Sequence, residues 1–116
     1  MNYNMMGVYN FSIMQGIEQV EVFSNWVVNN VPLTLSQAED IRVDFKRNSK
    51  STAVDLSLSL SNGGLIIKDN ALEFHFGVNT SDLSEGIYLY DILIVLQGKH
   101  HTYVRGEMTV YPVITK

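Results

Sequence analysis

The chain has 116 residues, of which 46% are hydrophobic and 17% charged, the size and composition of one compact domain. It contains no cysteine, which excludes disulfides, cysteine-ligated zinc and thiol catalysis. The net charge is -4 and the only basic group is modest, at Arg42, Lys46, Arg47 and Lys50, so we expect no nucleic-acid-binding face.

We expect a single β-sandwich domain over residues 1–116, in which residues 1–6 form a flexible N-terminal arm. The N-terminal stretch has no basic start followed by a long apolar core, so no secretory signal is expected. The longest aliphatic run, Ile92 to Leu96, is too short to cross a bilayer as a helix. No contact with membranes is therefore expected.

The N-terminal third predicts strands and one helical turn. Two β-rich segments, residues 7–16 and residues 17–30, are separated by a glycine. The following "LSQAED" places Ser36 three residues before Glu39, the spacing of a helix capping box. This motif predicts a short helical turn there, or a helix that continues to Arg47.

Alternation of apolar and polar residues predicts the middle strands, because successive side chains of a strand point to opposite faces. The pattern covers residues 41–46, 54–61 and 72–79. The intervening "NGG" favours the positive φ of a tight turn, so we expect a hairpin between strand 54–61 and residues 65–67. A second turn is expected at "KDN", before the last of these strands.

The C-terminal third predicts two strands, 87–96 and 102–113, that pair across a hairpin from Gly98 to His101. The whole chain then contains about seven or eight strands with short connections. This count favours an all-β sandwich over a barrel.

Tyr88 lies two residues after Gly86, directly behind the polar turn segment "TSDLSEG". Many immunoglobulin-like sandwiches have a tyrosine at this place, whose hydroxyl bonds back to the preceding corner, the tyrosine corner. Alternatively, the ring packs inward with its hydroxyl at the edge. The strand pattern predicts an all-β fold, and a tyrosine corner at Tyr88 would be typical of an immunoglobulin-like antiparallel β-sandwich.

Asp91 interrupts a strand that is otherwise nearly all apolar. It is in phase with Leu89 and Leu93 and out of phase with Tyr88 and Tyr90. If the carboxylate points inward it must be paired or hydrogen-bonded, because a bare buried charge is costly. We expect a structural hydrogen bond to a turn, in a strand that is covered on both faces or lies in an oligomer interface.

The C-terminal sequence "GIYLYDILIVLQGKHHTYVRGEMTVYPVITK" resembles that of small bacteriophage virion proteins with immunoglobulin-like domains. Those proteins typically end with glycine-x-tyrosine-x-tyrosine-aspartate-aliphatic, a glycine hairpin, a strand containing glycine, and a closing valine and threonine. The matching positions are Gly86, Tyr88, Tyr90, Asp91, Ile92, Gly98, Val104, Gly106, Val110, Val113 and Thr115.

The N-terminal half is similar to the same proteins in "YNFSIMQG", "VEVF" and "VPLTL", so the resemblance extends from Val8 over nearly the whole chain. Residues 46–53 and the "HH" pair have no counterpart, and Ile114 separates the closing valine from the threonine. The resemblance implies a non-enzymatic structural protein of the virion, assembled in the host bacterial cytoplasm. It would bind capsid, neck, tail or baseplate proteins, as a homo-oligomer or as part of a ring or capsid assembly.

No set of residues predicts catalysis, a cofactor or a metal site. His100 and His101 are adjacent in the expected hairpin, with no third ligand at a metal-site spacing. His75 alternates with two phenylalanines and is expected to face solvent or a partner. The serines of strand 54–61 form its outer face, outside any nucleophile elbow.

A carbohydrate-binding or cell-surface adhesion module is the alternative function, because sugar-binding sandwiches use exposed aromatic platforms. Trp26, Tyr9, Tyr103 and Tyr111 are the rings available for it. Trp26 is expected in the core, in a protein interface or in such a platform. Trp26, Tyr103 and Tyr111 are also the aromatics expected to contact a protein partner.

Overall fold

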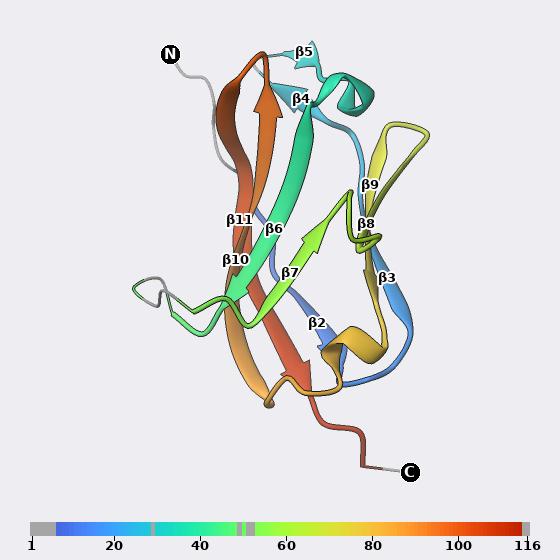
Figure 1. Ribbon diagram of the computed structural model, residues 1–116, viewed down its shortest axis with the longest axis vertical. Helices are drawn as coiled ribbons and strands as arrows, with labels where there is room; N and C mark the ends of the chain where they lie inside the picture. The colour runs from blue at the N-terminus through green and yellow to red at the C-terminus, as the bar shows by residue number, and fades with distance from the viewer. Residues whose placement is uncertain (1–6, 29, 49, 51–52, 115–116) are drawn as a thin grey trace.

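A computed structural model describes residues 7–28, 30–48, 50 and 53–114. These residues form an all-β structure with eleven strand segments and two short 3₁₀ turns (Figure 1). The expected all-β class is therefore confirmed, and the expected arm at residues 1–6 lies outside the described residues. The 3₁₀ turns are η1 (Leu35–Gln37) and η2 (Val78–Thr80).

The larger sheet has six strands, in the order β1-β11-β10-β6-β7, with β2 also paired to β11. Both N-terminal strands run parallel to β11, which the expected antiparallel sandwich did not include, whereas the other strand pairs of the described residues are antiparallel. The strands of the larger sheet are β1 (Gly7–Val8), β2 (Phe11–Met14), β6 (Asp40–Lys46), β7 (Leu56–Ser59), β10 (Gly86–Leu96) and β11 (Lys99–Tyr111).

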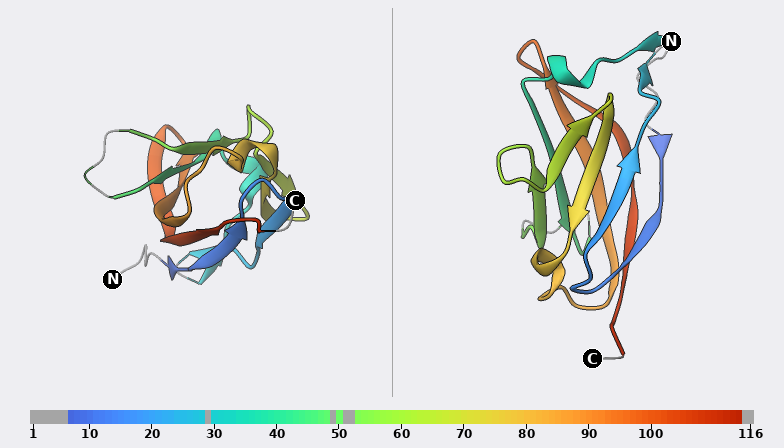
Figure 2. Two further views of the ribbon diagram at one scale, coloured as in Figure 1. Left: turned by 90° about the horizontal axis from the view of Figure 1, so that it is seen from below. Right: turned by 90° about the vertical axis from the view of Figure 1, so that its right-hand side faces the viewer.

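The second sheet has three antiparallel strands in the order β3-β9-β8. They are β3 (Gln19–Phe23), β9 (Ala71–Phe76) and β8 (Leu65–Lys68). A small third sheet pairs β4 (Val27–Val28) with β5 (Val31–Pro32) at one end of the molecule. Viewed end-on, the strands surround one interior (Figure 2).

Aromatic side chains from both larger sheets fill this interior. Phe74 of β9 is fully buried, and its ring centroid lies 4.5 Å from that of Phe23 and 6.3 Å from that of Phe45. Phe45 belongs to β6 of the larger sheet, so these contacts join the two sheets directly. Edge-to-face and tilted ring pairs of this kind add to the stabilisation from burial.

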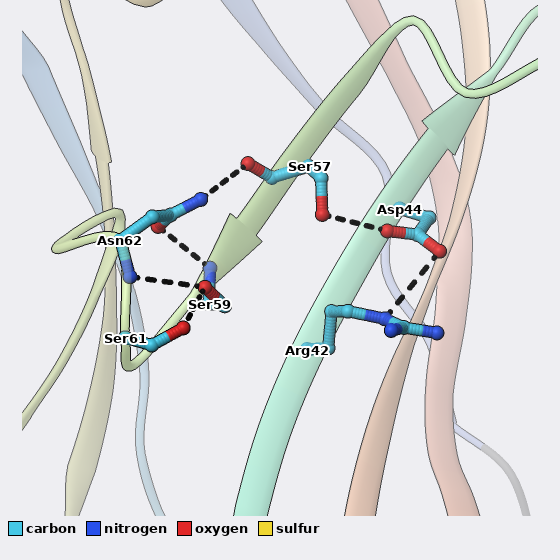
Figure 3. Close-up of polar contacts among 6 residues, drawn as sticks. All are labelled: Arg42, Asp44, Ser57, Ser59, Ser61 and Asn62. Atoms are coloured by element: carbon cyan, nitrogen blue, oxygen red, sulfur yellow. Dashed lines mark hydrogen bonds and ion pairs between the residues drawn. The ribbon is translucent and has the colours of Figure 1, made fainter.

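The turn at residues 60–64 carries the chain from one sheet to the other. Strand β7 pairs with β6, and β8 pairs with β9, so the expected hairpin between them was wrong although a turn does form. The Asn62 side chain closes it by accepting a hydrogen bond from the Ser59 amide and donating one to the Ser57 carbonyl (Figure 3). Its Oδ1 also accepts a hydrogen bond from the Gly64 amide. Local turn chemistry thus specified a bend without specifying the strand partner.

Two other turns form tight hairpins. Asp69 and Asn70 have positive φ between β8 and β9, as "KDN" predicted. Gln97 and Gly98 also have positive φ, in the turn between β10 and β11. This hairpin is therefore tighter than expected, and the two histidines belong to β11.

The "LSQAED" segment does form a helical turn, η1, followed directly by β6. The longer helix was wrong, because Asp40–Lys46 is a strand. Thr34, rather than Ser36, is at the N-cap position, without a capping hydrogen bond from its side chain. The Leu35 amide instead donates to Asn70 Oδ1 at 2.8 Å, which ties the turn to the β8–β9 hairpin.

Candidate functional site

Tyr88 forms the hydrogen bond that defines a tyrosine corner. Its ring is buried, and its hydroxyl donates to the Ser84 carbonyl oxygen at 2.8 Å. The Arg47 guanidinium lies over the ring, 4.8 Å from its centroid, and donates to the Glu85 carbonyl. Tyr88 therefore holds the loop before β10 in place, which is a structural role.

The Tyr88→Phe variant keeps the ring and loses only this hydrogen bond, so we expect it to lower the free energy of unfolding by about 1 kcal/mol. Urea denaturation of both proteins measures the loss. Tyr111→Phe is the matched control, because the exposed Tyr111 hydroxyl bonds to no described residue, and its loss should be much smaller. Equal stability of wild type and Tyr88→Phe would show that the corner contributes nothing.

Tyr90 and Gly106 together fix the connection between β1 and β2. The Tyr90 hydroxyl donates to the Tyr9 carbonyl oxygen at 2.5 Å. A Cβ at Gly106 would lie only 1.9 Å from that same oxygen. The N-terminal segment can therefore cross β11 at this point only because residue 106 has no side chain. Burial raises the pKa of the Tyr90 phenol, which therefore stays protonated and can donate.

The remaining glycines of the resemblance also have structural reasons. Gly86 has a φ of 131°, and a Cβ there would meet the Arg47 guanidinium at 2.9 Å. Gly98 has a φ of 75° in the β10–β11 turn. Positive φ favours glycine because it has no Cβ.

The outward side chains of β6, β10 and β11 form one surface of the larger sheet, which we call the outer face. Asp91 lies on this face, opposite the buried face of Tyr90 and Ile92. Its register partners on that face are Asp44 and Arg105. Its carboxylate accepts no hydrogen bond from any described residue, so the expected bond to a turn is not formed. Desolvation by the surrounding side chains, and then the charge of Asp44, raise the pKa of Asp91, while Lys46 lowers it.

This raised pKa predicts a pH-dependent stability. A carboxyl whose pKa is higher in the folded than in the unfolded chain binds more protons when folded, so stability falls as pH rises through both values. Asp91→Asn should therefore be more stable than wild type at pH 7, and the difference should shrink towards pH 3. Urea denaturation of dilute protein over this range tests it, and parallel pH profiles of the two proteins would contradict it.

A shallow hollow of about 560 Å³ surrounds Asp91 on this outer face. Strands β6, β10 and β11 form its floor, and the β1–β2 connection forms one side. Its lining includes both carboxylates and cationic side chains, chiefly Asp44, Lys46, Asp91, Arg105 and Glu107.

The charges of the outer face are partly paired within the chain. Asp44 accepts a hydrogen bond from the Ser57 hydroxyl at 2.8 Å and lies 3.6 Å from Arg42 Nε (Figure 3). Arg42 and Arg47, two members of the basic group noted in the sequence, are thus engaged with neighbours. Lys46, Arg105 and Glu107 form no side-chain hydrogen bond or ion pair with the part of the chain that the structure describes.

The aromatic residues singled out in the sequence lie in three different places. Trp26 is 7% exposed and its Nε1 donates to the Phe23 carbonyl, so it belongs to the core and is neither a partner contact nor a platform. The Tyr103 ring is half-buried and stacks on His101, with centroids 5.6 Å apart. Tyr111 is 53% exposed at the end of β11, and of the three it alone presents an open ring.

The histidines do not converge. His100 pairs in register with Val95 and His101 with Ile94, so their side chains point to opposite faces of β11. His75 Nε2 lies 2.9 Å from Glu73 Oε1 on the other sheet. In the described ranges, no group of three His, Cys, Asp or Glu side chains could hold a metal ion.

Sequence reasoning missed Lys46, Arg105 and Glu107 as members of one surface. The alternation along each strand indicates that they point outward, but only strand register brings β6, β10 and β11 side by side.

No helix among the described residues is long and apolar enough to span a membrane. No protein-family model matches the chain, and no curated protein is significantly similar to it.

Proposed function

We propose that the chain is a non-enzymatic structural protein of a bacteriophage virion, an immunoglobulin-like β-sandwich that binds neighbouring capsid, neck, tail or baseplate proteins. The observation that supports it is the role of the residues that carry the resemblance. Tyr88 ties down a corner, Tyr90 and Gly106 fix a chain crossing, and Gly98 forms a turn. These residues stabilise a scaffold, as a protein that acts by assembly requires.

The strand order supports the immunoglobulin-like part of the proposal. A sheet of β1 and β2, β11, β10, β6 and β7 is opposed by a sheet of β3, β9 and β8. Sandwiches of this class divide their strands between two sheets in a comparable way and often have a tyrosine corner. Asp91, another residue of the motif, lies on the outer face, where it is available to a neighbour.

Quantitative mass spectrometry of purified, salt-washed phage particles from the source culture tests the proposal. The quantity measured is the number of copies of this chain per copy of the major capsid protein. A ratio near one per capsid subunit or capsomer would indicate a decoration protein, and a few to a dozen copies per particle would indicate a neck, tail or baseplate component. Absence from particles that contain all other structural proteins would overturn the proposal.

The carbohydrate-binding alternative gains no support from Trp26, which is buried in the core. Tyr9 is partly exposed, but its hydroxyl donates to Glu21 at 2.6 Å and its ring packs on Phe11 and Phe23. A sugar platform needs several flat, open rings on one surface. No specific observation therefore favours this function over the proposed one.

A further inference from the structure

We infer that the outer face is a self-complementary surface that binds a second copy of this chain about a two-fold axis parallel to β10. The inference rests on strand register and charge, and it holds whether or not the chain occurs in a virion. It therefore goes beyond the proposed function.

Register defines the pattern of side chains on this face, because directly paired residues of neighbouring strands point to the same side. Strand β10 runs down the middle and contributes Leu89, Asp91 and Leu93. Strand β6 lies on one side of it and β11 on the other. The pairs across β10 are Lys46 with Glu107, Asp44 with Arg105, Arg42 with Thr102, and Asp40 with His100.

Each of the first two pairs joins opposite charges at the same level of β10. A two-fold axis along β10 places β6 of one copy over β11 of the other, with every residue at its own level. Lys46 would then face Glu107 of the second copy, and Asp44 would face Arg105 of the second copy. Symmetry repeats both contacts, so four opposite-charge pairs surround the axis.

The central strand supplies the apolar part of the contact. Leu89 and Leu93 are half-buried and would each lie against the same residue of the second copy. Asp91 would face its own copy, which is the one like-charge contact in the arrangement. The hollow around it leaves room for long Lys and Arg side chains and for water, both common in polar interfaces.

The leucines and the charges together favour this axis over one perpendicular to the strands. At the level of Asp91 a perpendicular axis would place Asp44 on Asp44, Arg105 on Arg105 and Lys46 on Arg42. Like charges directly opposed across an interface disfavour association. One residue away it would pair Lys46 with Asp44 and Glu107 with Arg105, but it would place Leu89 on Asp91 instead of on Leu89.

The size of the surface predicts weak, reversible association. The three strands of the outer face, at about 4.8 Å spacing and with some seven residues along each, cover about 350 Å² per copy, which is below the usual size of a specific interface. We therefore expect a dissociation constant in the submillimolar range, which is about -6 to -5 kcal/mol.

Charge exchange tests the pairing. In sedimentation equilibrium of the full chain, Lys46→Glu and Glu107→Lys should each weaken self-association about tenfold, since each creates two like-charge contacts. The double variant K46E/E107K should restore the wild-type constant, because the pair is re-formed with reversed signs. Lys68→Glu, an exposed charge reversal on β8 of the other sheet, is the control and should change little.

This design separates the pairing from a general effect of net charge. Lys46→Glu makes the acidic chain more negative and Glu107→Lys makes it less negative, so a general effect would move the two variants in opposite directions. A chain that stays monomeric at about 1 mM, or a double variant as weak as the singles, would overturn the inference. The face would then be open to a different protein.

Cysteine substitution gives a second test that is independent of charge. The chain contains no cysteine, so a single introduced thiol can form only an intermolecular disulfide. Leu89→Cys lies beside the axis and should be trapped as a covalent dimer under mild oxidation. Val22→Cys, exposed on β3 of the other sheet, should not. Equal crosslinking of both would contradict the proposed face.

Discussion

Replacing Gly106 with alanine is expected to lower the free energy of unfolding by about 3 kcal/mol, one of the largest effects of a single methyl group in this protein. The new Cβ would lie 1.9 Å from the Tyr9 carbonyl oxygen and 2.7 Å from the Tyr9 carbonyl carbon. Both are backbone atoms, which cannot rotate away as a flexible side chain would. The whole β1–β2 connection must therefore move.

That movement would break the hydrogen bonds that hold the connection on β11. The Tyr9 amide donates to the Arg105 carbonyl at 2.9 Å, and the Glu107 amide donates to Asn10 Oδ1 at 2.9 Å. The buried Tyr90 hydroxyl would also lose its acceptor, the Tyr9 carbonyl. An unsatisfied buried donor costs more than the bond itself contributes.

Urea denaturation measures this loss, and Gly7→Ala is the matched control. Gly7 lies on β1 in the same segment, but a Cβ there would meet only the Tyr103 carbonyl oxygen at 3.8 Å, an ordinary contact. We expect its effect to stay within about 0.5 kcal/mol of wild type. If Gly106→Ala proved as stable as Gly7→Ala, the crossing would not depend on the missing side chain.

The sequence predicted which side of each strand is buried far better than which strands are neighbours. On β6, the residues Ile41, Val43 and Phe45 are fully buried, and the charged residues between them point outward, as the alternation indicated. Side-chain direction depends on the period of two within one strand. It therefore needs no knowledge of the rest of the fold.

The β10–β11 hairpin followed from its local turn signal, but the pairing of strands that are not joined by a tight hairpin depended on contacts that no local pattern encodes. The "NGG" turn satisfied every local rule for a hairpin, yet β7 joins β6 and β8 joins β9. The parallel pairing of β1 and β2 with β11 links segments about a hundred residues apart. The same dependence hid the outer face, since Asp44 and Arg105 become neighbours of Asp91 only through register.

Most residues that carry the resemblance have a different role from the residues of the outer face, and Asp91 alone is named in both groups. Tyr88, Tyr90 and Gly106 make internal contacts and keep the strands in place. Lys46 and Glu107 contribute charge to the surface. Substitutions in the first group should therefore change stability, and substitutions in the second should change association at nearly constant stability.

Phe74→Ala is expected to have the largest effect on stability, a loss of about 4 kcal/mol in the free energy of unfolding. Phe74 is fully buried, and its ring contacts aromatic rings from both sheets. Its neighbours are Phe11, Phe23, Phe45, Phe76 and Tyr90, with centroids 4.5 to 6.3 Å away. Alanine would leave a space between the sheets that these rigid rings cannot close.

Thermal and urea denaturation distinguish this loss from a general effect on β9. A loss of this size corresponds to a fall of roughly 15–20 °C in Tm for a domain of this length. Phe74→Leu retains most of the buried volume and should cost about 1–2 kcal/mol.

Ile66→Ala is the surface control, because Ile66 lies on the neighbouring strand β8 with 43% of its surface exposed, and its loss should stay below about 1 kcal/mol. The three variants should therefore rank by the buried volume each removes. If Phe74→Ala cost no more than Ile66→Ala, the aromatic contacts between the sheets would not be what holds them together. The stability of the fold would then have to come chiefly from the buried aliphatic residues of the same core, such as Leu58, Leu72 and Ile92.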